Sequence, residues 1–164
     1  MLSLIAFSGL LFGILLGYIN PEELKPGKKY FKIFCLLVLF SILLVLFFSY
    51  KFSIIGLALG VAIGFFLKKE YFYLGLSVVA SYTLGLNLLL SSLVFVYGLP
   101  YGSLLILKSK KIWKEIMFDL ILFLIPFLLL INNIVSNYIN IFVGFLIGAL
   151  VMVLTENVVC KRNY

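Results

Sequence analysis

Asp119 is the residue of this chain best suited to chemistry, because it lies in an otherwise apolar segment. It follows the basic residue Lys114 by five positions, which corresponds to about 7 Å along a helix. An acidic side chain inside a membrane is costly and usually faces the bundle interior, a water-filled cavity or a partner. Two hypotheses follow. Asp119 handles an ion or a proton inside the protein, or it lies at the interface with Glu115 and Lys111 and reaches lipid headgroups.

Glu156 is a second acidic candidate at a similar depth, near the end of the last apolar segment. Lys161 and Arg162 follow it closely, so an interfacial ion pair is the alternative to a functional role. Two acids at matching depth could together bind a cation or a proton. The sequence does not show that Asp119 and Glu156 meet.

The segment Gly98-Leu-Pro-Tyr-Gly102 places a proline between two glycines inside an apolar run. This pattern predicts a broken helix, and irregular backbone at membrane depth must line a cavity or be buried in protein. Broken helices mark binding sites in many transporters. Gly98, Pro100 and Gly102 are therefore candidates for substrate or ion binding, with a plain kink or an interfacial turn as the alternative.

Asn87 is the last candidate for substrate or ion binding, in a segment that also carries Ser81, Thr83, Ser91 and Ser92. Small polar side chains in a membrane helix can line a path for a solute. More often they hydrogen-bond neighbouring helices or form an external turn. The sequence leaves both interpretations open.

Enzyme chemistry is not predicted for this chain. It has no histidine, and its two cysteines, Cys35 and Cys160, lack a neighbouring base and a Cys-x-x-Cys spacing. The sequence carries no glycine-rich phosphate loop and no paired-carboxylate motif. We therefore expect two free structural cysteines and no catalytic residue, metal or cofactor.

The composition predicts an all-α, polytopic membrane protein. Of the 164 residues, 65% are hydrophobic and 12% are charged, far from the values of soluble domains. Several apolar segments approach the roughly 20 residues that a helix needs to cross a bilayer. The net charge of +7 arises from basic residues in the turns between these segments, which favours lipid headgroups over nucleic acid as partners.

The apolar segments predict helices at about 2–19, 31–49, 54–67, 115–131 and 141–159. The first helix is expected to be retained, because it lacks the basic start and the exit site of a cleavable signal. Pro21 and Pro26 are expected to keep the 20–32 loop non-helical. Residues 71–107 are too long for one straight span. They form either two short helices that turn near 87–92 or one helix followed by a re-entrant piece.

The distribution of basic residues predicts the orientation. Seven crossings with the N-terminus outside place 12 of the 13 Lys and Arg residues in the cytoplasm and leave Lys51 outside. Six crossings plus a re-entrant hairpin give the same sidedness. Six crossings with 98–103 as an external loop would split the basic residues about evenly and are the poorer account. We expect a multi-pass protein of the cell membrane with a cytoplasmic C-terminus.

Small residues at four-residue spacing predict helix packing faces, because lipid-embedded helices associate where their backbones approach closely. The predicted packing residues are Gly9, Gly13, Gly17, Gly56, Gly60, Gly64, Ser77, Ser81, Gly85, Gly144 and Gly148. The helices that carry them are expected in the centre of the bundle. The helices at 31–49 and 115–131 lack such a ladder and are expected against lipid.

The sequence predicts repeated two-helix hairpins within a single transmembrane domain. A glycine-ladder helix, a lysine-bearing turn and an apolar helix recur at 1–49 and 54–87. Residues 88–131 are a candidate degenerate third copy, and 141–159 form a final single helix. The ladder helices all run in the same direction, so we expect parallel repeats related by an axis along the membrane normal.

These features favour a small transporter or channel-like protein for a small solute or ion, assembled as an oligomer or with other membrane chains. The alternative is a non-catalytic structural or assembly subunit that docks other membrane proteins through its glycine faces. A membrane enzyme acting on lipid is the third hypothesis. A transporter should carry polar residues at mid-depth, whereas an assembly subunit should have a dry interior and an exposed small-residue face.

Overall fold

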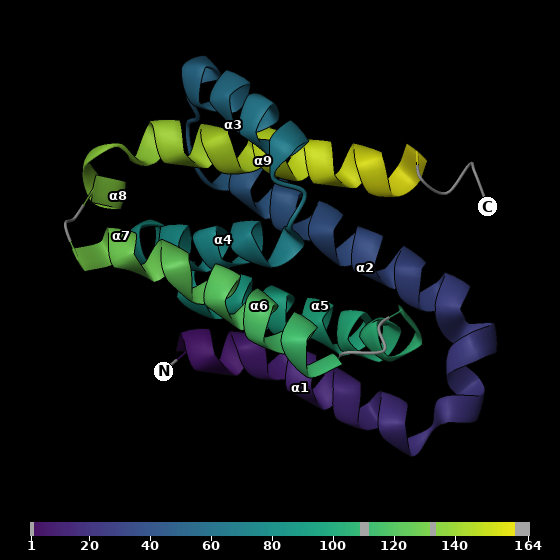
Figure 1. The fold of residues 1–164 in the computed structure, drawn as a ribbon. Helices are drawn as coiled ribbons and strands as arrows, with labels where there is room; N and C mark the ends of the chain where they lie inside the picture. Colours follow the sequence, from purple (N-terminus) through teal and green to yellow (C-terminus); the bar gives the residue numbers. More distant parts are fainter. Residues whose placement is uncertain (1, 109–111, 132–133, 160–164) are drawn as a thin grey trace.

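The computed structural model describes residues 2–108, 112–131 and 134–159, and every regular element within them is a helix (Figure 1). In chain order the elements are α1 (Leu2–Ile19), α2 (Pro21–Ser49), α3 (Ile54–Phe66), α4 (Glu70–Leu84), α5 (Asn87–Lys108), α6 (Ile112–Leu124), the 3-10 helix η1 (Ile125–Phe127), α7 (Leu128–Ile131), α8 (Ile134–Asn137) and α9 (Ile139–Val159). The all-helical prediction is confirmed for these residues.

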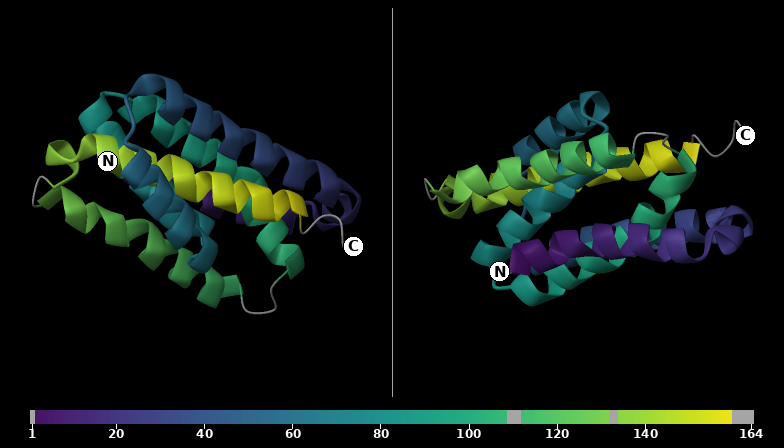
Figure 2. Two further views of the ribbon diagram at one scale, coloured as in Figure 1. Left: turned by 90° about the horizontal axis from the view of Figure 1, so that it is seen from above. Right: turned by 60° about the horizontal axis from the view of Figure 1, so that its bottom comes forward.

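The long helices alternate in direction along the chain. Helices α1, α3, α5 and α9 run one way, and α2, α4 and α6 return the other way (Figures 1 and 2). The C-terminal ends of the first four therefore gather at one end of the bundle. The start of α2 carries Lys25 and Lys29 at that end, and the turn between α3 and α4 carries Lys68 and Lys69, so we name it the lysine end. The other end, which holds the α4–α5 turn, is the opposite end.

The most extensive helix contact joins α1 to α5, and the two helices lie parallel. Gly9 packs against the backbone of Phe95 and Gly13 against the backbone of Leu99. The residue numbers at the contact therefore increase in the same direction along both helices, as they do in a parallel pair. A side chain at either glycine would overlap the facing backbone. Ser103 adds an interhelical hydrogen bond, donating from Oγ to the carbonyl oxygen of Gly13 at 2.8 Å. Close backbone contact through glycine is a common mode of helix association in membranes.

A second glycine contact joins α3 to α9 and repeats the first. Gly56 packs against the backbone of Ile141, as Gly9 packs against Phe95. The two contacts are related by a shift of 47 residues from Gly9 to Gly56 and of 46 residues from Phe95 to Ile141. The later glycines keep these shifts, so the same parallel contact is built twice in one chain.

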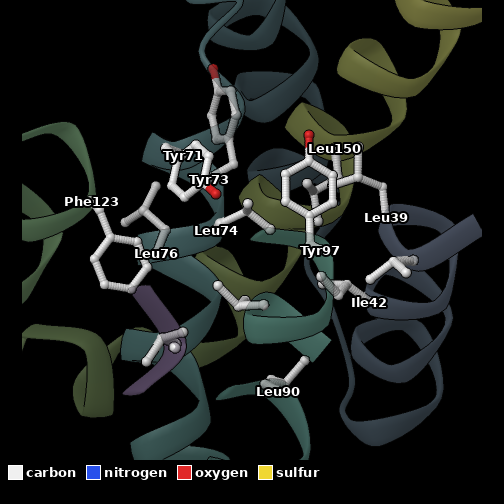
Figure 3. Close-up of a cluster of buried hydrophobic side chains, with 14 of the residues drawn as sticks. Leu39, Ile42, Tyr71, Tyr73, Leu74, Leu76, Leu90, Tyr97, Phe123 and Leu150 are labelled. Atoms are coloured by element: carbon white, nitrogen blue, oxygen red, sulfur yellow. The ribbon is translucent and has the colours of Figure 1, made fainter. Parts of the chain in front are cut away.

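Helix α4 lies at the centre of the bundle, where it contacts α5, α6 and α9. Tyr71 and the whole stretch Tyr73–Ser81 are buried on it. Side chains from α2, α5, α6 and α9 surround this stretch and complete the hydrophobic core (Figure 3). Gly75 lets α4 approach the backbone of Phe123 on α6.

The positions of two helices in the bundle, α3 and α2, differ from the expectation. Helix α3 lies at the edge of the bundle, and its outer face leaves Ala58 and Ala62 exposed. Helix α2, expected against lipid, buries the stripe Cys35, Leu39 and Ile42 and contacts both α5 and α9. A glycine ladder defines one packing face, whereas the place of a helix depends on whether its other faces are also covered.

Among the described residues, three helical segments are long and apolar enough to cross a membrane: Leu24–Ser49, Asn87–Leu107 and Ile139–Asn157. Two shorter apolar segments, Leu4–Ile19 and Ile54–Phe66, accompany them.

The expectation of a non-helical 20–32 loop is wrong, because α2 already begins at Pro21. Proline fits the first helical position, whose backbone N–H has no intrahelical partner in any residue type. Pro26 lies inside the helix, where it removes one backbone hydrogen bond. Because Pro26 lies near the N-terminal end of α2, the missing hydrogen bond does not end the helix, which continues to Ser49.

Residues 71–107 form two helices, which corresponds to the first of the two alternatives. Helix α4 ends at Gly85, whose φ of 71° is the left-handed conformation that favours glycine at a helix C-terminus. Helix α5 then runs unbroken through Pro100 to Lys108, so the predicted break at 98–102 is wrong. Pro126 falls in η1, where it interrupts the path from α6 to α7.

Candidate functional site

Glu70 occupies the first position of α4, at the lysine end. The Tyr97 hydroxyl on α5 donates a hydrogen bond to its Oε2 atom. The Asn157 Nδ2 atom on α9 donates to its Oε1 atom at 2.7 Å. Both oxygens of one carboxylate therefore accept from helices that belong to different glycine contacts. These two bonds hold the N-terminal end of α4 against α5 and α9.

Asp119 lies two turns into α6 at the same end of the bundle and is only 2% exposed. Its Oδ2 atom lies 3.5 Å from the Tyr101 hydroxyl, which can donate to it. Ile116 and Phe123 are buried on the same face of α6. Of the two hypotheses drawn from the sequence, this position agrees with a carboxylate inside the protein rather than one among headgroups.

Three tyrosines fill the space around the two carboxylates. Tyr97 and Tyr101 lie one turn apart on α5 and stack with their ring centroids 5.6 Å apart. Tyr71 on α4 meets Tyr101 edge-on at 5.1 Å, and in Figure 3 its ring lies between Phe123 and Tyr97. The Tyr71 hydroxyl is buried, and among the residues that the structure describes it has no hydrogen-bond partner. We name Glu70, Tyr71, Tyr97, Tyr101 and Asp119 the acid–tyrosine cluster.

Further charged groups surround the acid–tyrosine cluster. Lys69 and Glu115 both interact electrostatically with Asp119. The Lys69 Nζ atom lies 4.8 Å from the centre of the Phe118 ring on α6. Cys35 of α2 is buried within electrostatic reach of Glu70. The cluster itself comes from α4, α5 and α6, and the surrounding groups add α2 and the turn before α4.

The chemistry of the acid–tyrosine cluster is that of oxygen donors. Carboxylates and phenolic hydroxyls can bind a proton or one small hard cation, or pass a proton between them. Within the residues described, no group of three or more His, Cys, Asp and Glu could hold a metal ion.

Of the six sequence-predicted binding candidates, Asp119 is the one that the structure places in the cluster. Glu156 lies beside it and forms an ion pair with Lys68 at 2.5 Å, with both side chains about half exposed. Its expected partners Lys161 and Arg162 lie outside the described residues. Asn87 lies at the opposite end, where its Oδ1 atom accepts from the Ser81 hydroxyl at 3.1 Å.

Gly98, Pro100 and Gly102 are buried on α5. A side chain at either glycine would overlap the backbone of α1 near Leu10. Their small size brings α1 and α5 together, so the structure gives them a packing role.

The sequence-predicted packing residues of α1, α3 and α9 lie in the two glycine contacts described above. On α4, Ser77 and Ser81 are buried, and Ser77 donates to the carbonyl oxygen of Leu74 on its own helix at 2.7 Å. Gly85 is not a packing residue, because a Cβ atom there would meet open space. The close approach of α4 occurs instead at Gly75, which the ladder of Ser77, Ser81 and Gly85 does not include.

Five residues of the site were missed by sequence reasoning: Glu70, Tyr71, Tyr97, Tyr101 and Asn157. In the sequence, Glu70 belongs to the pattern of a lysine-bearing turn, and Asn157 belongs to the end of a predicted helix. A signal was present in the spacing of Tyr97 and Tyr101, because residues four apart share one face of a helix. Two tyrosines on one face of an apolar helix need polar partners for their hydroxyls when that face is buried.

Comparison of the chain with protein-family models, with characterised proteins and with solved structures finds no significant match.

Proposed function

We propose that the chain is a multi-pass integral membrane protein with seven crossings, an external N-terminus and a cytoplasmic C-terminus. The crossings are α1, α2, α3, α4, α5, the α6–α7 segment and α9. The parallel contacts of α1 with α5 and of α3 with α9 support this topology, because alternating crossings make all odd-numbered ones parallel. The lysine end is then the cytoplasmic end, as the distribution of basic residues requires.

The outer surface also supports a bilayer environment. Large apolar side chains are exposed on most helices, among them Phe48, Phe66, Leu88 and Trp113, each more than 70% exposed. A soluble monomer rarely exposes so much continuous apolar surface. Helices α3 and α4, with 13 and 15 residues, are short for a span, so the bilayer would thin around them or flanking side chains would reach the interface.

We infer that the protein is a transporter or channel-like protein for a small ion, with the acid–tyrosine cluster as its binding site. The observation that carries this proposal is the burial of Asp119 beside Tyr101 and Tyr71, close to Glu70. Buried carboxylates in membrane bundles are costly to keep, and in transport proteins they mark ion sites and proton relays. A purely structural bundle could fill the same space with apolar side chains.

The test is proton flux in reconstituted vesicles that contain a pH-sensitive dye. We expect an imposed pH gradient to decay faster with the wild-type protein than in empty vesicles. Asp119→Asn preserves the shape of the side chain, removes its titratable charge and should return the rate to that of empty vesicles. The control is Glu22→Gln, an exposed acid at the start of α2 and outside the cluster, which should retain the flux. Wild-type flux equal to that of empty vesicles in proton, sodium and potassium gradients would refute ion transport.

One observation favours the second candidate function, a non-catalytic assembly subunit. Ala58 and Ala62 form a small-residue face on the exposed side of α3, away from α9. Such a face allows another membrane helix to approach closely. Ala62→Leu should then reduce the size of the complex isolated in mild detergent, whereas in a monomeric transporter it should leave both size and flux unchanged.

A further inference from the structure

The two glycine contacts divide the bundle into two compact helix pairs. The first pair is α1 with α5, and the second is α3 with α9. Within each pair the backbones touch, so little relative movement is available without losing the contact. Helices α2 and α4 each contact both pairs and join them through side chains. Movement between the pairs therefore disturbs less packing than movement within them.

At the lysine end, both pairs are tied to the same carboxylate. Tyr97 of the first pair donates to one oxygen of Glu70, and Asn157 of the second pair donates to the other. The ion pair between Lys68 and Glu156 ties the α3–α4 turn to α9 beside this point. Among the residues that the structure describes, Glu70 thus bridges the two pairs through its own hydrogen bonds.

We propose that Glu70 is the coupling residue of this protein. When ionised, it holds the two helix pairs together at the lysine end, and loss of its charge lets them separate. The proposal deepens the proposed ion transport and rests on it for its physiological role. Helix pairs that move against each other around a fixed site are a common way for transporters with internal repeats to open one side.

Protonation would weaken the bridge for a definite chemical reason. A hydronium ion of the solvent gives a proton to the carboxylate, so one O–H bond forms on Glu70 while one O–H bond of hydronium breaks and leaves water. An ionised carboxylate is only an acceptor, whereas a protonated one presents a donor on one of its two oxygens. A donor on Oε1 would face the Asn157 amide donor, and a donor on Oε2 would compete with the Tyr97 hydroxyl. One of the two bonds must be lost or rearranged.

The groups that face Glu70 come from every helix packed around it. Cys35 faces it from α2, Tyr71 from its own helix, Tyr97 and Tyr101 from α5, Asp119 from α6 and Asn157 from α9. Asp119 is the one other acid among them, and the two carboxylates interact electrostatically. A proton or a cation held at Asp119 would change that interaction. The two carboxylates are therefore linked, and the charge state of one affects the bridge made by the other.

The experiment measures the separation of the two pairs directly. Spin labels are placed at Leu107 of α5 and Thr155 of α9, both outside the cluster, in a background without Cys35 and Cys160. We expect Glu70→Gln to lengthen the label distance by at least about 2 Å, the scale of helix shifts in switching proteins. Asn157→Leu should lengthen it similarly, and the double variant should add nothing further. Glu22→Gln, an exposed acid at the start of α2, is the matched control and should keep the wild-type distance.

The unmodified cluster supplies an independent readout, should Glu70→Gln fail to fold. The labelled protein with Glu70 intact is titrated from about pH 8 to about pH 4, which brackets the ordinary titration of a carboxyl group. We expect the distance to lengthen at the acidic end and, where the Gln variant folds, to be independent of pH in it. An unchanged distance across this range, or a folded Gln variant with the wild-type distance, would overturn the proposal.

Flux measurements on the same samples separate this proposal from the proposed function. Lengthening of the label distance without any wild-type ion flux would keep the Glu70 bridge and refute transport. Ion flux that depends on Asp119, combined with a label distance that changes neither with pH nor with Glu70→Gln, would support transport and refute the Glu70 bridge.

Discussion

At the scale of single residues, the two carboxylates of the acid–tyrosine cluster have different surroundings. Glu70 accepts two hydrogen bonds from other helices, whereas Asp119 has one long contact from Tyr101. A carboxylate with two donors is held in place, and one with a single weak partner is freer to exchange a proton or an ion. This difference suits Glu70 to hold helices together and Asp119 to bind the ion of the proposed transport.

Tyr97→Phe should show how much the bond to Glu70 contributes to stability. The change removes one hydroxyl and leaves a partly buried carboxylate short of a donor, so we expect a loss of about 1–3 kcal/mol in the free energy of unfolding. Thermal melts in detergent provide the measurement. The control is Tyr82→Phe, because Tyr82 is exposed on α4 and should lose little. Equal melting temperatures for Tyr97→Phe and the wild type would show that the bond to Glu70 adds nothing.

Ser103→Ala should have a smaller effect at the α1–α5 contact. It removes the hydrogen bond to the Gly13 carbonyl oxygen, and such interhelical bonds contribute about 0.6 kcal/mol on average in membrane bundles. Ser92→Ala on the same helix is the matched control, since the Ser92 hydroxyl donates within its own helix to Leu88. The prediction fails if the control lowers the melting temperature as much as Ser103→Ala does.

At the scale of helices, the glycine ladders were readable from the sequence, but their partners were not. The ladder of α1 meets Gly98 and Gly102 of α5, and the ladder of α3 meets Gly144 and Gly148 of α9. All of these ladders offer similar small surfaces, so spacing alone does not say which two will pair. Pro100 made α5 harder to predict, because a proline between two glycines is typical of a broken helix. In the folded protein, α1 covers the glycine face and the helix continues.

Gly60→Leu should disrupt the α3–α9 contact, because a side chain there would overlap the backbone of Phe145. Overpacking of this kind typically costs about 1–3 kcal/mol. Ala62→Leu tests the same enlargement two positions away, on the exposed side of α3. Leu44→Ala on the exposed side of α2 is a second control and should also cost little. Thermal melts of the three variants should rank Gly60→Leu as by far the least stable, and any other order would contradict the contact.

At the scale of the whole molecule, the repeat was visible in the sequence as recurring hairpins. Its three-dimensional form was not predicted, because each hairpin leaves its ladder helix free to pair with a helix distant in the chain. Helix α1 of the first hairpin pairs with α5 of the third segment, and α3 pairs with α9. The two pairs therefore interleave along the chain. The 88–131 segment takes part in the repeat through α5.

The candidate site was predictable only in part, for a related reason. Asp119 stands out because a carboxylate in an apolar helix is rare. Glu70, Tyr97 and Asn157 each look ordinary at the end or on the side of their own helix. Their meeting depends on how α4, α5 and α9 converge at the lysine end, and that convergence is set by the glycine contacts. Local patterns identify unusual residues, whereas a site assembled from ordinary ones requires the fold.

The last prediction concerns the proposed topology and uses single cysteines in a background without Cys35 and Cys160. A membrane-impermeant thiol reagent should label Lys51→Cys and Asn137→Cys from outside intact cells, and Lys29→Cys and Lys114→Cys only after the membrane is opened. All four positions are exposed in the structure, so access is decided by the side of the membrane.

Leu88→Cys, in the first turn of α5, decides whether α4 and α5 both cross the membrane. Leu88 is 73% exposed, and in the seven-crossing topology it lies at the external surface, so it should be labelled from outside. A re-entrant hairpin would instead leave this turn within the membrane and slow its labelling relative to Asn137→Cys. Labelling of Lys29→Cys or Lys114→Cys in intact cells would reverse the orientation. It would also place the acid–tyrosine cluster on the external side.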